Sequence, residues 1–215
     1  ADLAAEAAAQ GRAAAHAADH ALHGLWMQLR CRQMRMMHEA CTVYPIEKRS
    51  NGKVWAIRDQ TLAGIDALKR MDLREEENVS TALGFLTHLV ITLAGILEVP
   101  LRFAVRDAGS SRSCVRDLHE TFDAVAGPAG VAGIAGGARG GAGARAAASP
   151  REWPLYYTRD LKKLQFDTAL RLLQDALLQF AYSRGQVGEW QCNNNLLECV
   201  QLILCREFFG PEAAG

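Results

Sequence analysis

The chain has 215 residues, of which 49% are hydrophobic, 22% charged and 7% aromatic. This composition excludes a fully disordered chain and a collagen-like one, and the length predicts one domain with an appendage. Basic and acidic residues each number 24, so the formal net charge is zero. Proteins that bind nucleic acid by neutralising phosphates usually carry excess positive charge, so we expect no nucleic-acid partner.

Six cysteines lie at positions 31, 41, 114, 192, 199 and 205, and none forms a Cys-x-x-Cys pair. A zinc ribbon and a thioredoxin-type motif are therefore excluded. The position of these cysteines in apolar helical stretches is typical of reduced thiols in a cytosolic protein. The chain begins at Ala1 without a Met or a signal-peptide signature, and we interpret it as a fragment of a longer protein.

Residues 1–41 predict one helix, which is rich in Ala in its first half and carries large apolar side chains in its second half. These side chains form a short seam like that of a coiled coil, in which the two positions of each seven-residue repeat that face the partner helix are called a and d. Two of the d positions hold charged residues, Arg32 and Glu39. Such a weak seam predicts either the end of a longer coiled coil or a helix that docks on its own domain. The candidate partner-binding residues are Leu22, Leu25, Leu29 and Met36.

A β-hairpin is predicted next, because the hydrophobic period changes after residue 41. Two apolar segments, 42–46 and 54–57, flank Asn51-Gly52, which is a favoured sequence for a type I′ turn. Pro45 has no amide proton to donate, so the first strand should lie at an edge of the sheet or begin at that residue. The segment that follows the hairpin has no clear pattern.

The most apolar stretch, residues 82–97, predicts a helix at the centre of the core. It is shorter than the ~20 apolar residues that a bilayer span needs, which favours a buried helix over a transmembrane one. Asn78 or Ser80 is expected to cap this helix, with an acidic run at 75–77 placed favourably at its N-terminus. The core residues at helical spacing are Leu83, Leu86, Val90, Leu93 and Leu97.

A strand is predicted over residues 101–106, with Leu101, Phe103 and Val105 on one face. Residues 124–150 are almost entirely Gly and Ala. They predict a flexible insertion, since they bury too little area to offset the entropy of ordering.

The last part of the chain predicts a strand at 152–157 and two helices. The first helix has apolar periodicity from Leu161 to Ala181 and ends at Gly185. The second begins after 193–195 and is stopped by the Gly-Pro pair at 210–211. Strands followed by helices in this order predict an α+β domain over residues 42–215.

Sequence motifs of catalysis are missing: there is no Walker A loop, HExxH, GxSxG or EF-hand loop. His16, His20 and His23 are spaced so that one helical face could present three imidazoles to a metal, but solvated histidines are the favoured interpretation. His88 on the apolar helix is interpreted as a satisfied core histidine rather than a catalytic base. We therefore predict that the chain is not an enzyme and needs no cofactor. A small enzyme that uses these histidines is the alternative.

Exposed aromatic residues suggest a membrane contact. Phe208 and Phe209 at the end of the last helix, or Trp190 before it, could insert into a bilayer interface. Core packing at a helix end is the favoured interpretation, and the membrane contact is the alternative.

Several segments, taken in order, carry a family resemblance: ALGFLTHLVITLAGILEVPL at 82–101, Arg102-Phe103, Gly109–Ser113, Glu152–Tyr156, Leu164–Asp167 and Leu172-Leu173. Together they resemble the C-terminal domain of the UV radiation resistance-associated protein family over roughly residues 42–205. Val43-Tyr44-Pro45-Ile46, which follows the predicted first helix, also resembles that family's junction between coiled coil and C-terminal domain.

The resemblance implies a non-catalytic role. Members of this family are Beclin-associated regulatory subunits of the class III phosphatidylinositol 3-kinase complex, and they act in endosomal trafficking and autophagy. It implies a parallel coiled coil with a Beclin-type partner through residues 1–41, and a BARA-like domain of repeated strand–helix units. It also implies a cytoplasmic protein that is peripheral on endosomal or autophagic membranes. The alternatives are the autophagy-specific sister subunit (Barkor) and a helical scaffold without a membrane role.

Overall fold

The computed structural model describes residues 2–49, 54–70, 76–106, 112–117, 152–156, 163–186 and 194–210. The chain divides into two compact units, residues 1–43 and residues 44–215. Three of the sequence predictions lie outside the described residues: the type I′ turn at Asn51-Gly52, the insertion at 124–150 and the position of Trp190.

The first unit is the single helix α1, Asp2–Val43. Its 42 residues correspond to a rod of about 60 Å. The helix extends two residues beyond the predicted end, and the Thr42 hydroxyl donates to the His38 carbonyl at 3.0 Å. The prediction that residues 42–45 belong to a strand is therefore wrong. The helix ends before Pro45 because the proline ring disfavours helical backbone in the residue preceding it.

The second unit begins with a three-stranded antiparallel sheet, sheet A, in the order β1-β2-β3. It consists of β1, Ile46–Arg49, β2, Val54–Ile57, and β3, Gln60–Leu62. The predicted hairpin is confirmed, with Ile46 opposite Ile57, and β1 is an edge strand that begins just after Pro45, as the missing amide proton requires. Sequence reasoning missed β3, as well as the short helix α2, Ile65–Leu68.

The predicted central helix is confirmed as α3, Glu76–Ile96, which packs against both sheets of the unit. All five residues named for its core are buried. It begins earlier than expected, so Asn78 and Ser80 lie inside the helix and the prediction that either one caps it is wrong. Glu77 lies in its first turn, where negative charge interacts favourably with the helix dipole.

The segment Glu77–Ile96 of α3 is long and apolar enough to cross a membrane, and 61% of its most apolar window is buried inside the protein. The same length and composition are found in core helices of folded domains. Because α3 contacts the strands on both sides of it, its apolar character is explained here by packing within the unit.

A second three-stranded antiparallel sheet, sheet B, has the order β4-β5-β6. Its strands are β4, Phe103–Arg106, β5, Cys114–Asp117, and β6, Glu152–Pro154. The predicted strands at 101–106 and 152–157 are both confirmed in shorter form, whereas β5 was missed. Of the three residues predicted to share one face, Phe103 is buried, and Leu101 and Val105 are half-buried.

Two helices complete the unit: α5, Lys163–Ser183, and α6, Leu196–Phe209. The predicted end of α5 is confirmed, because Gly185 has a φ of 68° and its amide donates to the Tyr182 carbonyl. The amide of Gln186 donates to the Ala181 carbonyl at 3.1 Å, which completes a Schellman motif. At the other helix, Asn195 caps α6 by accepting from the amide of Leu197 at 2.9 Å.

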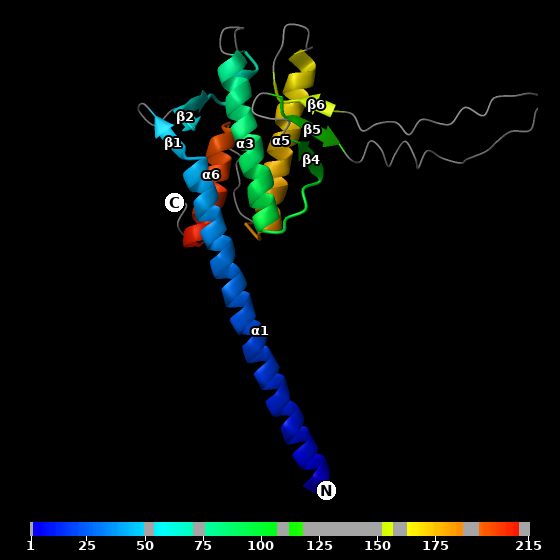
Figure 1. Ribbon diagram of the computed structural model, residues 1–215. Coiled ribbons are helices and arrows are strands. Elements are labelled where there is room, and N and C mark those ends of the chain that lie inside the picture. The colour runs from blue at the N-terminus through cyan, green and yellow to red at the C-terminus, as the bar shows by residue number, and fades with distance from the viewer. Residues whose placement is uncertain are drawn as a thin grey trace, which may run out of the picture. The chain divides into compact units, whose positions relative to one another are not determined.

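Within this unit the three long helices lie between the two sheets, as Figure 1 shows. Sheet A contacts α3 and α6, and sheet B contacts α3 and α5. The helices meet around an apolar cavity of about 10 Å³ lined by Val90, Leu93, Leu177, Phe180, Val200 and Ile203. The α+β class is thus confirmed, and each sheet is followed by a helix of 21 residues.

The start of α6 is tied to the end of sheet A over a large separation in sequence. Asn195 donates from its side-chain amide to the Leu62 carbonyl at 3.0 Å. The Asn194 carbonyl accepts from the Ile65 amide at 2.6 Å. Gly64 permits this approach, because a Cβ atom there would lie 2.7 Å from the Asn194 carbonyl oxygen.

Candidate interaction surfaces

The second half of α1 carries a stripe of large apolar side chains that are exposed. All four predicted partner-binding residues belong to it: Leu22 is 66% exposed, Leu25 63%, Leu29 48% and Met36 45%. Sequence reasoning did not assign Trp26 and Met27, which are 58% and 46% exposed. Exposed apolar stripes of this kind are typical of helices that pack against another surface.

Two charged residues interrupt the seam at d-type positions. Arg32 and Glu39 are both exposed, and Glu39 accepts from the Arg35 side chain at 3.1 Å. Charges at core positions of a coiled coil lower its stability, but they restrict the choice of partner and register. The stripe is therefore better suited to a partner with complementary charges than to a purely apolar one.

The three histidines of α1 that are spaced for a metal, His16, His20 and His23, have exposed side chains. No group of His, Cys, Asp or Glu that could hold a metal ion occurs among the residues that the structure describes. His16 and His20 are exposed, and His23 stacks on Trp26 with their ring centroids 6.3 Å apart. The interpretation as solvated histidines therefore agrees with the described geometry.

The interpretation of His88 as a core histidine is wrong. Its side chain is exposed, on the stripe of α3 that its neighbours cover least, and its ring centroid lies 5.3 Å from that of Tyr44. The Arg58 guanidinium lies 5.9 Å from the Tyr44 ring and 5.1 Å from the Phe85 ring. Periodicity alone missed this because α3 is nearly as apolar on its less covered side as on its buried side.

The two phenylalanines assigned to a membrane contact differ in exposure. Phe209 is 76% exposed, whereas Phe208 is half-buried, and their ring centroids lie 6.3 Å apart. Both lie at the C-terminal end of α6, where Glu207 forms an ion pair at 2.8 Å with Arg184, the residue that follows α5. Only Phe209 therefore presents most of its ring to the surroundings.

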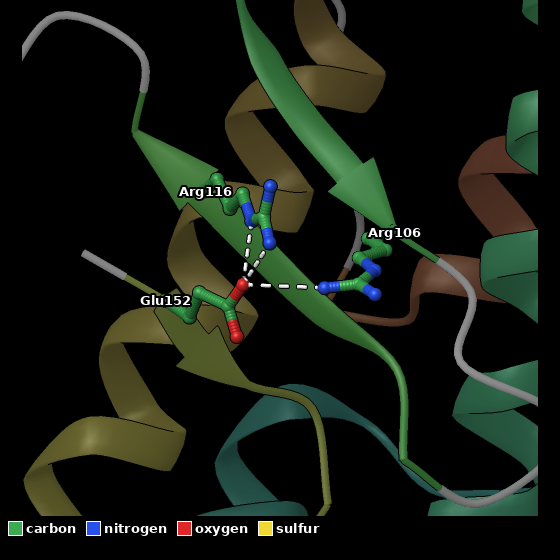
Figure 2. A network of polar contacts seen from close by, with 3 residues as sticks. All are labelled: Arg106, Arg116 and Glu152. Atoms are coloured by element: carbon green, nitrogen blue, oxygen red, sulfur yellow. Dashed lines mark hydrogen bonds and ion pairs between the residues drawn. The ribbon is translucent and has the colours of Figure 1, made fainter. Parts of the chain in front are cut away.

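Sheet B carries a polar network that sequence reasoning did not find (Figure 2). Glu152 on β6 lies directly across from Arg116 on β5, and its Oε1 atom accepts from Arg116 Nε at 2.6 Å and also from Arg116 Nη2. Arg106 Nη1 on β4 reaches the same oxygen at 3.5 Å. Two guanidinium groups from neighbouring strands thus converge on a single carboxylate oxygen.

This network changes the acidity of two groups. The hydrogen bond from Arg116 lowers the pKa of Glu152 below its ordinary value, with the charges of Arg116 and Arg106 acting in the same direction. Burial raises the pKa of the Cys114 thiol, and the nearby Glu152 charge adds to that rise. Cys114 is therefore a neutral thiol at physiological pH, without the thiolate character that a nucleophile needs.

The described geometry defines a mixed helix-and-sheet module with exposed contact surfaces, typical of proteins that assemble with others. In sequence, the chain is similar to the UV radiation resistance-associated protein of Mus musculus, with 27% identity over 161 residues. These residues are 74% of this chain and 18% of that protein, so the chain spans less than a fifth of the length of its relative. No protein-family model matches the chain, and no solved structure matches it.

Proposed function

We propose that this chain is a non-catalytic regulatory or scaffolding module that pairs through α1 with a Beclin-type partner in a class III phosphatidylinositol 3-kinase complex. The observation that carries the proposal is the exposed stripe of Leu22, Leu25, Leu29 and Met36. The similarity to the UV radiation resistance-associated protein, whose family the sequence motifs resemble, supports the identity of the partner.

The arrangement of the second unit also supports this assignment. Two antiparallel sheets of three strands are each followed by a helix of 21 residues. A BARA-like domain of repeated strand–helix units is the architecture that the resemblance implies. We accordingly propose a peripheral location on the cytoplasmic side of endosomal or autophagic membranes.

The charged positions of the seam favour a heterologous partner. In a parallel, in-register homodimer, equivalent d positions face one another, so Arg32 would face Arg32 and Glu39 would face Glu39. Like charges at such positions are repulsive, whereas a partner with an acidic residue opposite Arg32 and a basic one opposite Glu39 is attracted. This argument disfavours a self-paired helical scaffold, which is the rival proposal.

The test is co-elution of the full-length protein with a Beclin homologue from the same organism in size-exclusion chromatography. We expect a heterodimer, and we expect the variant Leu25→Glu/Leu29→Glu to weaken it by at least about tenfold, because each buried leucine contributes ~1.5–3 kcal/mol. Leu164→Glu is the matched control, since this leucine is 74% exposed but lies on α5.

A homodimer that the same double variant disrupts would instead establish the helical scaffold. Failure of the wild-type protein to co-elute with the Beclin homologue would overturn the proposed function.

A membrane contact through Phe208 and Phe209 is a second proposal, supported by the 76% exposure of Phe209. Exposed aromatic rings at a helix end partition into the interface of a bilayer. We expect Phe209→Ser to reduce co-flotation of the protein with phosphatidylcholine–phosphatidylserine vesicles, while Tyr182→Ser, which alters another exposed ring, has a smaller effect. Equal flotation of wild type and Phe209→Ser would contradict this contact.

A further inference from the structure

The outward face of sheet B, defined by Arg106, Arg112, Cys114, Arg116 and Glu152, carries more positive than negative charge. Neighbouring residues in a strand point to opposite faces, and the register pairs Arg106 with Cys114 and Arg116 with Glu152. These four residues therefore share one face. Val115, on the alternate position of β5, is fully buried on the opposite face.

Arg112 extends this face beyond the end of β5. The Leu155 amide donates to the Ser113 carbonyl at 2.8 Å, so the pairing of the two strands continues for one more residue pair. Ser113 and Leu155 are both buried, as inward-facing residues are. Alternation then places Arg112 outward, and its side chain is exposed.

The middle of this face is formed by small side chains. Ala104 lies opposite Arg116, and Cys114 lies opposite Arg106. Ala104 is half-buried and Cys114 buried, while Arg106 and Glu152 keep 57% and 44% of their side chains exposed. Three arginines thus share one face of the sheet with these small side chains.

Among the described residues of this face there is one carboxylate, Glu152, against three arginines. Glu152 uses its Oε1 atom for the contacts with both Arg116 and Arg106. A guanidinium group has five N–H donors, so both arginines retain donors beyond the contacts to this atom. Glu152 therefore shows how a carboxylate from outside would be held on this face.

We propose that the outward face of sheet B binds an acidic segment of a partner protein, whose carboxylates contact Arg106 and Arg112 beside the existing Arg116–Glu152 pair. The charge of the face and the planar fork of the guanidinium group match carboxylates. The zero net charge of the whole chain makes a protein segment a better match than a nucleic acid. This surface is independent of α1 and of the partner proposed for it.

The test measures binding of a fluorescein-labelled oligoglutamate peptide to the full chain by fluorescence anisotropy. We expect binding that weakens with rising salt, and none of an oligolysine peptide. The variant Arg106→Gln/Arg112→Gln should weaken the binding by about threefold to thirtyfold. The variant Arg12→Gln/Arg171→Gln removes the same charge from exposed positions on α1 and α5 and should leave the binding nearly unchanged.

Glu152→Gln removes the internal competitor, so it should tighten peptide binding by about twofold to fivefold. Circular dichroism checks that each variant is folded, and Arg112→Gln alone, outside the strand, provides the measurement if the double variant unfolds. Equal weakening by the two double variants, or weaker binding by Glu152→Gln, would overturn the proposal. Binding to phosphatidylserine vesicles without binding to the peptide would overturn it in favour of a lipid surface.

Discussion

At the residue scale, Glu98 occupies a position that its backbone and its charge both disfavour. It follows α3 with a φ of 54°, and its amide donates to the Gly95 carbonyl at 3.4 Å while the Val99 amide donates to the Ala94 carbonyl at 2.9 Å. This is a Schellman motif with glutamate where glycine is usual. A negative charge at a helix C-terminus also opposes the helix dipole.

We therefore expect Glu98→Gly to raise the free energy of unfolding by about 1 kcal/mol, as measured by urea denaturation. Glu98→Gln removes the charge and keeps the strained backbone, so its gain should be smaller. A loss of stability in the glycine variant would show that the Glu98 side chain makes a contact that outweighs the strain.

At the scale of elements, the start of α6 depends on Asn195. Its side chain caps the helix and also donates to the Leu62 carbonyl at the end of β3. Asn195→Ala removes both interactions, so we expect a loss of about 2–3 kcal/mol in the free energy of unfolding.

Asn195→Asp separates the two contributions of this residue. Aspartate retains the oxygen that caps α6 but has no donor for the Leu62 carbonyl. An intermediate loss, measured in the same urea titration, would assign the difference to the bond between α6 and sheet A. Wild-type stability for Asn195→Ala would contradict both contributions.

The pairing of β5 with β6 should depend on pH through Glu152. Because Arg116 lowers the pKa of Glu152 in the folded state, the carboxylate stabilises the fold fully above its ordinary pKa of about 4.3. That contribution is lost as the pH falls through the lower folded-state value. Since 44% of the Glu152 side chain is exposed to solvent, this contribution amounts to less than about 1 kcal/mol.

We expect Glu152→Gln to be slightly less stable than wild type at neutral pH, and the difference to shrink to zero as the pH falls from neutral through the lowered folded-state pKa of Glu152. Chemical denaturation of both proteins across this pH range measures it. A difference that stays constant down to acidic pH would show that the ion pairs with Arg116 and Arg106 are not its source.

Some elements can be predicted from neighbouring residues alone, whereas others depend on pairing with distant strands. The helix α5 was predicted because its apolar residues recur at helical spacing and a glycine ends it. The strands β3, Gln-Thr-Leu, and β5, Cys-Val-Arg-Asp, were missed because neither shows an alternation of apolar and polar side chains. Their strand conformation comes from the hydrogen bonds that β2, β4 and β6 supply.

At the scale of the whole second unit, stability depends on α3, which contacts both sheets. Leu86 and Leu93 are 0% and 2% exposed. Leu86→Ala or Leu93→Ala should each lower the free energy of unfolding by about 2–5 kcal/mol, since the lost methyl groups leave a cavity between packed neighbours.

Leu164→Ala is the matched control for these two substitutions, because Leu164 is 74% exposed. It should change the free energy of unfolding by less than about 0.5 kcal/mol. Near-wild-type stability for both core variants in a thermal or urea melt would show that α3 contributes little to the core.

The candidate surfaces were predictable to different degrees. The stripe of Leu22, Leu25 and Leu29 follows from a seven-residue spacing within one helix, which is visible in the sequence. The network of Arg106, Arg116 and Glu152 joins residues from three strands, and Arg116 and Glu152 are 36 positions apart in the sequence. The alternation Arg112-x-Cys114-x-Arg116 is its one local signal, and it becomes informative only once β5 is known to be a strand.

For this chain, the order of amino acids alone determined the long helices, the end of α5 at Gly185, the start of α6 after Asn195 and the apolar stripe of α1. These features depend on neighbours within one or two helical turns. Packing in three dimensions decided that β3 and β5 are strands, that His88 is exposed and that Glu152 meets two arginines. Short strands take their conformation from their pairing partners, and the exposure of a side chain depends on which distant segments cover it.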